Sequence, residues 1–139
     1  MDGARNLFNE EEAKEFITGY PSLPEALGLR LYTSRLIGKD KRLVLHGGGN
    51  TSVKLRMKNV VGEEREVLFI KGSGVTLAGI EPEGMVGLEL QELRKLRTLK
   101  ILSDDEMENQ LQIRKISHPS LDPSVETLEF RRLLLNQLL

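Results

Sequence analysis

The sequence has 139 residues, of which 39% are hydrophobic and 29% are charged, a balance typical of one folded domain rather than a disordered chain. Its 20 basic and 21 acidic residues leave a formal net charge of -1, which gives no electrostatic reason to expect a nucleic acid or an anionic membrane as a partner. The lack of cysteine excludes disulfides and cysteine-ligated zinc, and without any bilayer-length apolar run or signal peptide we expect a cytoplasmic protein.

Two helices are predicted at the start of the chain. Asn9 precedes three glutamates at 10–12, and a short polar cap with an acidic first turn favours a helix start. Pro21 ends this segment, and residues 22–38 form the second predicted helix. The positions in it that recur at helical spacing are Leu27, Leu31, Ser34, Leu36 and Ile37.

Strands are predicted in the middle of the chain. The short apolar run 43–45 is the first, and residues 52–58 then alternate polar and apolar side chains, the period of a half-buried strand. Gly62 marks a hairpin turn and residues 67–70 form the returning strand. Such short connections favour antiparallel pairing, because a parallel crossover needs a longer link.

The second half is predicted to be mainly helical. Leucines recur at every third position from Leu90 to Leu99, and Ser103 with Glu106 fits a capping box that opens a further helix. Asp122 and Pro123 suit the N-cap and first residue of a last helix. The expected fold is a single α/β domain over 1–139, with helices around a mainly antiparallel central sheet.

Two glycine-rich turns, 47–52 and 71–74, are the main candidates for function. Consecutive glycines expose main-chain N–H groups that can form a concave anion site. The side chains that could add donors are those of Asn50, Ser52, Ser73 and Lys71. A phosphate could bind if the sheet brings the two turns side by side; the alternative is that each is only a tight turn. Neither turn matches a P-loop or a dinucleotide-binding motif.

The start of the last predicted helix is the third candidate. Ser124 lies where free N–H groups attract anions, and Glu126 in the same first turn could move a proton on a bound substrate. The alternative for Glu126 is that an acidic residue merely complements the helix dipole.

Three segments together, 43–52, 67–74 and 123–126, resemble the class II aldolase/adducin family. Residues 27–36 and 80–82 are similar to its subgroup in which a rhamnulose-1-phosphate aldolase is fused to an alcohol dehydrogenase. The resemblance spans residues 25–128 and implies a three-layer lyase fold, of which this chain resembles an incomplete N-terminal portion.

The resemblance implies roles for individual residues. Its phosphate-binding positions fall on Gly49, Asn50, Ser52, Ser73, Gly74 and Ser124. Val125 replaces a second phosphate-binding serine, which would weaken or reshape that site. Glu126 matches the family's acid/base glutamate, which acts beside a zinc ion.

The zinc ligands of the family are not matched here. The resemblance implies a His-x-His pair after the glutamate and a third, distant histidine, whereas this sequence has only His46 and His118. We therefore expect no metal in this chain and little aldolase activity from it alone. The apolar segment 133–139 favours a homo-oligomer. The alternatives are a non-catalytic interaction domain, as the adducin branch implies, and an unrelated small α/β protein.

Overall fold

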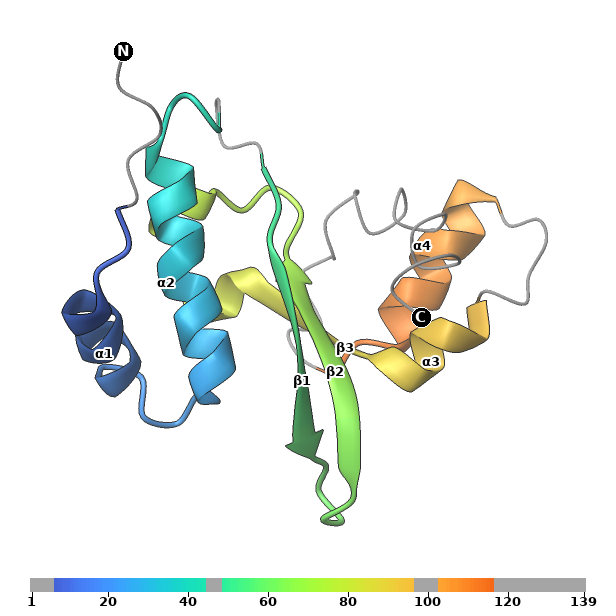
Figure 1. Ribbon diagram of the computed structural model, residues 1–139. Coiled ribbons are helices and arrows are strands. Elements are labelled where there is room, and N and C mark those ends of the chain that lie inside the picture. Colours follow the sequence, from blue (N-terminus) through green and yellow to red (C-terminus); the bar gives the residue numbers. More distant parts are fainter. Residues whose placement is uncertain (1–6, 45–48, 97–102, 117–139) are drawn as a thin grey trace.

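The computed structural model describes residues 7–44, 49–96 and 103–116 (Figure 1). Its strands β1 (Ser52–Lys58), β2 (Glu64–Lys71) and β3 (Met85–Glu89) form one sheet in the order β1-β2-β3. Helices α1 (Glu10–Thr18) and α2 (Glu25–Lys39) lie on one side of it, and α3 (Leu90–Lys95) and α4 (Asp104–Ile113) lie on the other. The predicted α/β class with helices around an antiparallel sheet is confirmed for this part of the chain.

Polar side chains cap the starts of α1 and α4, whereas α2 begins after a proline. Asn9 Oδ1 accepts hydrogen bonds from the main-chain N–H groups of Glu11 (2.9 Å) and Glu12 (3.1 Å), which confirms the predicted start of α1. The start of α2 lies three residues later than predicted, because Pro24 occupies the N-cap and restricts the residue before it. Ser103 Oγ accepts from Glu106 N at 3.2 Å at the start of α4, as predicted.

The first two strands match the predictions closely. β1 covers the predicted residues 52–58, and β2 extends the predicted 67–70 at both ends. They pair antiparallel, with Ser52 opposite Ile70. Asn59 accepts main-chain hydrogen bonds in the turn between them, so the hairpin predicted at Gly62 is confirmed.

The third strand was not predicted. β3 is buried over Met85–Leu88, so its side chains show no polar–apolar alternation, and Gly87 interrupts the apolar run. β3 pairs with β2, and Ile116 N donates to Gly87 O at 2.9 Å along its other edge. Two short 3-10 turns, η1 (Leu77–Gly79) and η2 (Pro82–Gly84), connect β2 to β3.

The strand predicted at 43–45 was wrong for its first two residues. Leu43 N and Val44 N both donate to Asp40 O, so the chain forms a turn after α2. Burial explains only its second residue: Val44 is 9% exposed and packs into the core, whereas Leu43 is 62% exposed. Leu45 lies outside the described residues.

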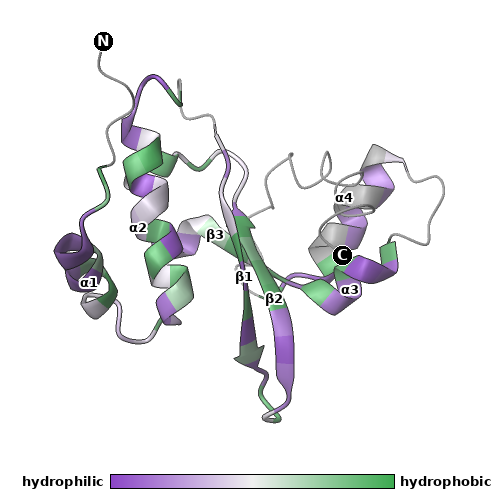
Figure 2. Ribbon diagram, viewed as in Figure 1, coloured by the Kyte–Doolittle hydropathy of each residue, from purple (hydrophilic) through white to green (hydrophobic). Residues whose placement is uncertain are grey.

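Two hydrophobic cores lie on opposite faces of the sheet. Val67 and Phe69 of β2 pack with the α2 residues Leu27 and Leu31, whereas the next residues along β2 pack against α3. Figure 2 shows the apolar half of β2 between these helices and its polar half near the hairpin. The described part of the chain contains no helix long and apolar enough to cross a membrane.

Candidate functional site

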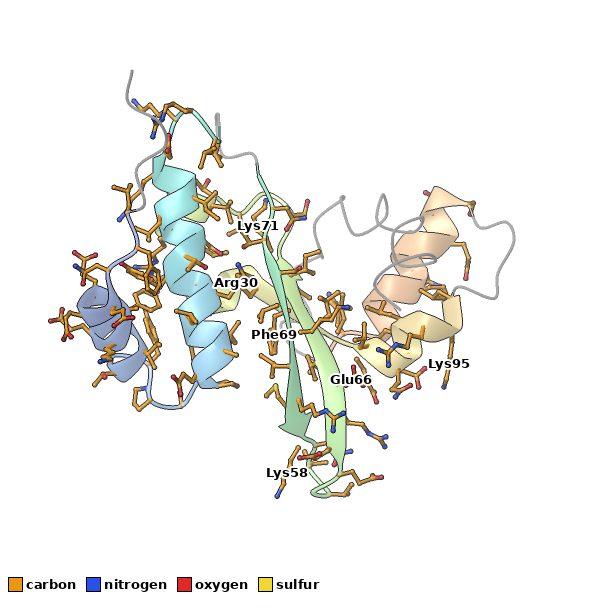
Figure 3. All side chains as sticks on the ribbon, in the orientation of Figure 1. Arg30, Lys58, Glu66, Phe69, Lys71 and Lys95 are labelled. Atoms are coloured by element: carbon orange, nitrogen blue, oxygen red, sulfur yellow. The ribbon has the colours of Figure 1, made fainter. Side chains whose placement is uncertain are left out.

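The start of β1 and the end of β2 form one corner of the sheet. Lys71 N donates to Thr51 O at 3.2 Å, which extends the strand pairing by one step beyond Ser52. The described part of the first glycine turn, residues 49–52, therefore lies beside the second turn at this corner (Figures 1 and 3). We call residues 49–52 and 71–75 the loop pair.

The first loop is held by packing beneath Gly49. This glycine has φ +83, in the left-handed region that residues with side chains rarely adopt. A Cβ there would lie 3.1 Å from both Leu77 Cδ1 and Val44 Cγ2. Glycine is thus required twice, by the backbone conformation and by the close approach of the core.

The carboxamide of Asn50 has no hydrogen-bond partner within the described part of the chain. Both Oδ1 and Nδ2 are buried, and neither has a hydrogen-bond partner among the described residues. Leaving a buried polar group without a partner costs about 1–3 kcal/mol, so such groups are uncommon and need a physical explanation. One explanation is a ligand or a water that supplies the missing partners.

The second loop is closed by its own main chain and by Lys71. Val75 N donates to Gly72 O at 3.2 Å, and Gly72 N donates to Gly84 O at 2.8 Å. Lys71 is only 5% exposed, and its Nζ donates to Val75 O at 2.9 Å. No carboxylate of the described residues forms an ion pair with it. A buried ammonium without a counter-ion is unfavourable unless an anion compensates it.

The structure brings together five of the predicted site residues. These are Gly49, Asn50, Ser52, Ser73 and Gly74. Ser52, Ser73 and Gly74 are exposed, so a ligand can reach them without opening the core. Ser124, Glu126, His46 and His118 lie outside the described residues, so their placement stays a prediction.

Sequence reasoning missed one residue that contacts the loop pair. Ser34 of α2 is fully buried, and its Oγ lies 2.6 Å from Thr51 Oγ1. The signal was present, because Ser34 is a polar residue on the apolar stripe that Leu27 and Leu31 define. A small hydroxyl on such a stripe indicates a specific partner across the interface.

The turn that leads from α2 toward the loop pair is fixed by a charge pair. Asp40 Oδ1 accepts from Arg42 N at 2.9 Å, and its Oδ2 accepts from Arg42 Nη2 at 2.9 Å. The hydrogen bonds from the Arg42 guanidinium and main chain hold the pKa of Asp40 below its usual range. The carboxylate therefore stays charged well into the acidic range.

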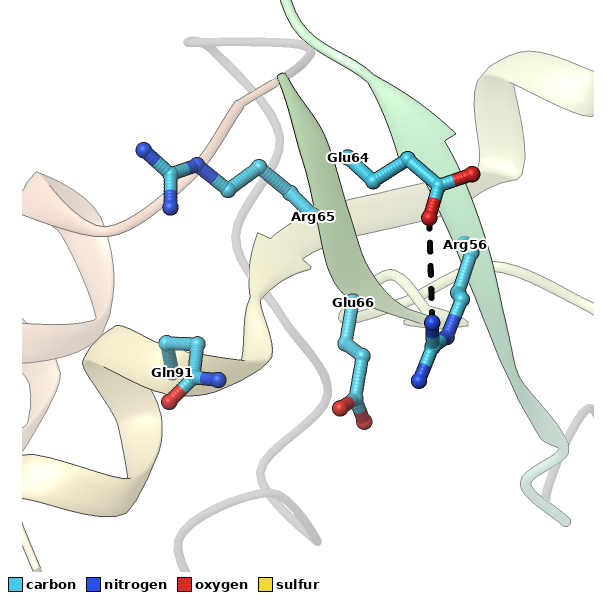
Figure 4. A pocket seen from close by; sticks show the side chains of 5 residues that line it. All are labelled: Arg56, Glu64, Arg65, Glu66 and Gln91. Atoms are coloured by element: carbon cyan, nitrogen blue, oxygen red, sulfur yellow. Dashed lines mark ion pairs between the residues drawn. The ribbon is translucent and has the colours of Figure 1, made fainter.

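A polar cavity of about 190 Å³ lies on the α3 side of the sheet, away from the loop pair (Figure 4). Its lining residues are Arg56, Glu64, Arg65, Glu66 and Gln91. Arg56 Nη1 lies 3.7 Å from Glu64 Oε2, and Glu66 pairs with Arg94 of α3 at 3.2 Å. Because these charges already neutralise one another, the cavity is a weaker candidate than the loop pair.

Comparisons with known proteins identify a family for this chain. The family model described as the Class II Aldolase and Adducin N-terminal domain matches residues 30–133. The uncharacterized oxidoreductase YuxG of Bacillus subtilis (strain 168) is 39% identical over 106 residues, which make up 76% of this chain and 15% of that protein. The chain therefore spans a small share of that relative's length.

A solved structure also matches. It is the structure of the N-terminal class II aldolase domain of a conserved protein from Thermoplasma acidophilum, with 37% sequence identity and a TM-score of 0.65. The match covers 73% of this chain and 47% of the other. Sequence and structure thus point to the same kind of domain.

Proposed function

Because this chain belongs to the class II aldolase and adducin N-terminal domain family, we propose that its loop pair binds the phosphate group of a sugar phosphate. The domain is then the substrate-binding part of a zinc-type aldolase, a carbon–carbon lyase. The observation that carries the proposal is the carboxamide of Asn50, buried beside the loops without a partner among the described residues.

The chemistry of Asn50 fits a sugar phosphate. Its Nδ2 group donates hydrogen bonds and its Oδ1 accepts them. Phosphate oxygens accept from N–H donors, and sugar hydroxyls donate to carbonyl oxygens, so one ligand supplies both missing partners. Free inorganic sulfate would satisfy the donor and leave the acceptor unpaired.

Lys71 supports an anionic ligand. Its ammonium is nearly fully buried, and among the described residues it donates to a neutral carbonyl, that of Val75. An anion bound between the two loops would offset the cost of holding this charge away from water. The exposed hydroxyls of Ser52 and Ser73 add further donors on the solvent side.

The finer assignments rest on the resemblance. We infer that Ser124 completes the phosphate site and that Glu126 acts as acid/base on the substrate, with Val125 reshaping the site where the family has a second serine. Rhamnulose 1-phosphate is the substrate that the resembling subgroup suggests. The geometry of the loop pair supports a bound phosphate group, and the choice of rhamnulose as the sugar rests on the resemblance.

Zinc does not fit the residues that the structure describes. Within 7–44, 49–96 and 103–116, no group of three histidine, cysteine, aspartate or glutamate side chains could hold a metal ion. The sequence has two histidines and no His-x-His pair, whereas catalytic zinc uses three protein ligands. We propose that the 139-residue chain alone has little retro-aldol activity; near-stoichiometric zinc by elemental analysis after dialysis would contradict this.

Calorimetric titration with inorganic phosphate and with a sugar phosphate tests the proposal. We expect both to bind the unaltered chain, the sugar phosphate more tightly. Lys71→Met should weaken phosphate binding roughly tenfold or more, because a hydrogen bond to a charged group contributes about 1.5–3 kcal/mol. Lys58→Met, at the far end of β1, is the matched control. No phosphate binding, or an equal loss in both variants, would overturn the proposal.

A second candidate function is a non-catalytic interaction domain, as in the adducin branch. One observation favours it: Val60 at the hairpin is 103% exposed and Ile116 is 50% exposed, and both line a cavity of about 450 Å³. Exposed apolar residues around a cavity are common at protein interfaces. A defined homo-oligomer whose assembly is unaffected by phosphate, measured by light scattering, would favour this function.

A further inference from the structure

One serine on the buried face of α2 connects the helix to the loop pair. Ser34 is 0% exposed, and its neighbours on that face, Leu27 and Leu31, are core leucines, so its hydroxyl lies in apolar surroundings. Ser34 Oγ donates to Arg30 O at 2.5 Å and lies 2.6 Å from Thr51 Oγ1. A buried hydroxyl in a helix is satisfied by the first contact alone. The second contact therefore needs its own explanation.

Hydroxyl chemistry fixes the direction of this chain of hydrogen bonds. Each hydroxyl carries one proton, and the carbonyl of Arg30 can only accept. The proton of Ser34 is used on Arg30 O, so Thr51 must donate its own proton to Ser34 Oγ. Hydrogen bonds in such a chain polarise and strengthen one another. The side chain of Thr51 is thereby held in one orientation.

Asn50 lies between two fixed residues as a result. On one side, Gly49 packs against the side chains of Val44 and Leu77. On the other side, Thr51 is held through its hydroxyl by Ser34 and through its carbonyl by the N–H of Lys71. Little backbone freedom remains between them. The backbone that carries the Asn50 carboxamide is thus held in place before any ligand arrives.

We propose that Ser34 is a positioning residue for the anion site: through Thr51 it sets the conformation of residues 49–52 and so the aim of the Asn50 carboxamide. This inference rests on the proposed phosphate-binding function. Ser34 does not touch the ligand. Its loss acts on affinity because the loop must then be ordered at the moment of binding, which lowers the net binding free energy.

Thr33 provides a matched control. Its Oγ1 also donates to Arg30 O, at 3.1 Å, and it lies on the same turn of α2. Within the described part of the chain, Thr33 forms no hydrogen bond with the loop pair. Thr33→Ala therefore removes a comparable helix contact without releasing Thr51.

The experiment compares five chains by phosphate calorimetry, hydrogen exchange of the amides at 49–52 and thermal unfolding. They are the unaltered chain, Ser34→Ala, Thr51→Val, the double swap Ser34→Thr with Thr51→Ser, and Thr33→Ala. The swap keeps both hydroxyls and the number of methyl groups, so it separates the hydrogen bond from packing. It also keeps the test decisive if Ser34→Ala fails to fold.

We expect Ser34→Ala and Thr51→Val each to weaken phosphate binding roughly three- to tenfold, the equivalent of one hydrogen bond, and to speed exchange at 49–52 by a similar factor. The swap should retain most of the affinity, and Thr33→Ala should change binding less than about twofold.

Two outcomes would overturn the inference in distinguishable ways. If the unaltered chain binds phosphate and Ser34→Ala binds it equally well, with unchanged exchange at 49–52, then Ser34 is only a core residue and the proposed function stands. If the unaltered chain binds no phosphate, the proposed function fails, and the anion role of Ser34 fails with it.

Discussion

Both ends of the β1–β2 pair carry an asparagine and a glycine, but the contacts of these residues differ between the two ends. At the hairpin end, Asn59 Oδ1 accepts from the main-chain N–H groups of Val61 (3.1 Å) and Glu63 (3.0 Å). At the loop end, both polar atoms of the Asn50 carboxamide are buried and unpaired among the described residues. The hairpin asparagine binds the main chain of its own turn, whereas the loop asparagine forms no side-chain hydrogen bond with residues 7–44, 49–96 or 103–116.

The glycines at these ends differ in the same way. Gly49 and Gly62 have almost the same φ, +83 and +82. A Cβ on Gly62 would meet nothing within 4 Å, whereas one on Gly49 would press on two core side chains. The hairpin is therefore a self-contained turn, whereas the loop end is held by other elements. Only the second arrangement leaves a side chain available to a ligand.

Asn50→Asp is expected to have the largest effect. It replaces a donor with a carboxylate of the same shape, which repels phosphate and cannot donate to it, so affinity should fall roughly a hundredfold. Asn59→Asp is the control, because a carboxylate oxygen still accepts from the turn N–H groups. Calorimetric titration with phosphate measures both. Equal affinities for the two variants would remove the distinction between the two ends.

Gly49→Ala and Gly62→Ala are expected to have the next largest effects. Gly62→Ala measures backbone strain alone, whereas Gly49→Ala measures backbone strain together with a packing conflict. Each forces a side chain into the left-handed region at a cost of about 1–2 kcal/mol. Gly49→Ala adds the contacts with Val44 and Leu77, so its total loss should be about 2–4 kcal/mol. Urea unfolding gives both values. A loss at Gly62 as large as that at Gly49 would show that packing at the loop end has no separate effect.

The smallest expected effect concerns Asp40, in the turn before the loop end. Because its folded pKa is lowered, its contribution to stability is present above the usual aspartate pKa and is lost as the pH falls through the lowered value. Asp40→Asn should therefore be less stable than the unaltered chain at neutral pH, and the difference should shrink in strong acid. Urea midpoints at about pH 7 and pH 2.5 measure this. A difference that stays constant with pH would argue against the charge pair.

The sequence was informative wherever one local rule decided the structure. Alternation over 52–58 predicted β1 with its observed bounds, and Asn9 before three glutamates predicted the start of α1. The antiparallel pairing of β1 and β2 was also predicted, and it places residues 49–52 beside the end of β2. These features depend on side-chain period and capping, which neighbouring residues determine.

Features decided by tertiary contacts were missed. β3 is buried on both faces, so its sequence lacks the period of a half-exposed strand. Leu43 and Val44 were predicted as a strand because a short apolar run does not distinguish a strand from a turn with one buried residue, here Val44. The burial of the Asn50 carboxamide and the contact between Ser34 and Thr51 depend on how α2 packs on the sheet. No local pattern encodes that placement.

Strand β2 contributes side chains to the hydrophobic cores on both faces of the sheet. Val67 and Phe69 belong to the core under α2, while Leu68 and Ile70 belong to the core under α3. Unfolding of either layer of helices would expose one face of β2. The stability of each layer therefore depends on the other. The described part of the chain should therefore melt as one cooperative unit, with the amides of β2 the slowest to exchange with solvent. Ligand at the end of this strand would then protect both layers at once.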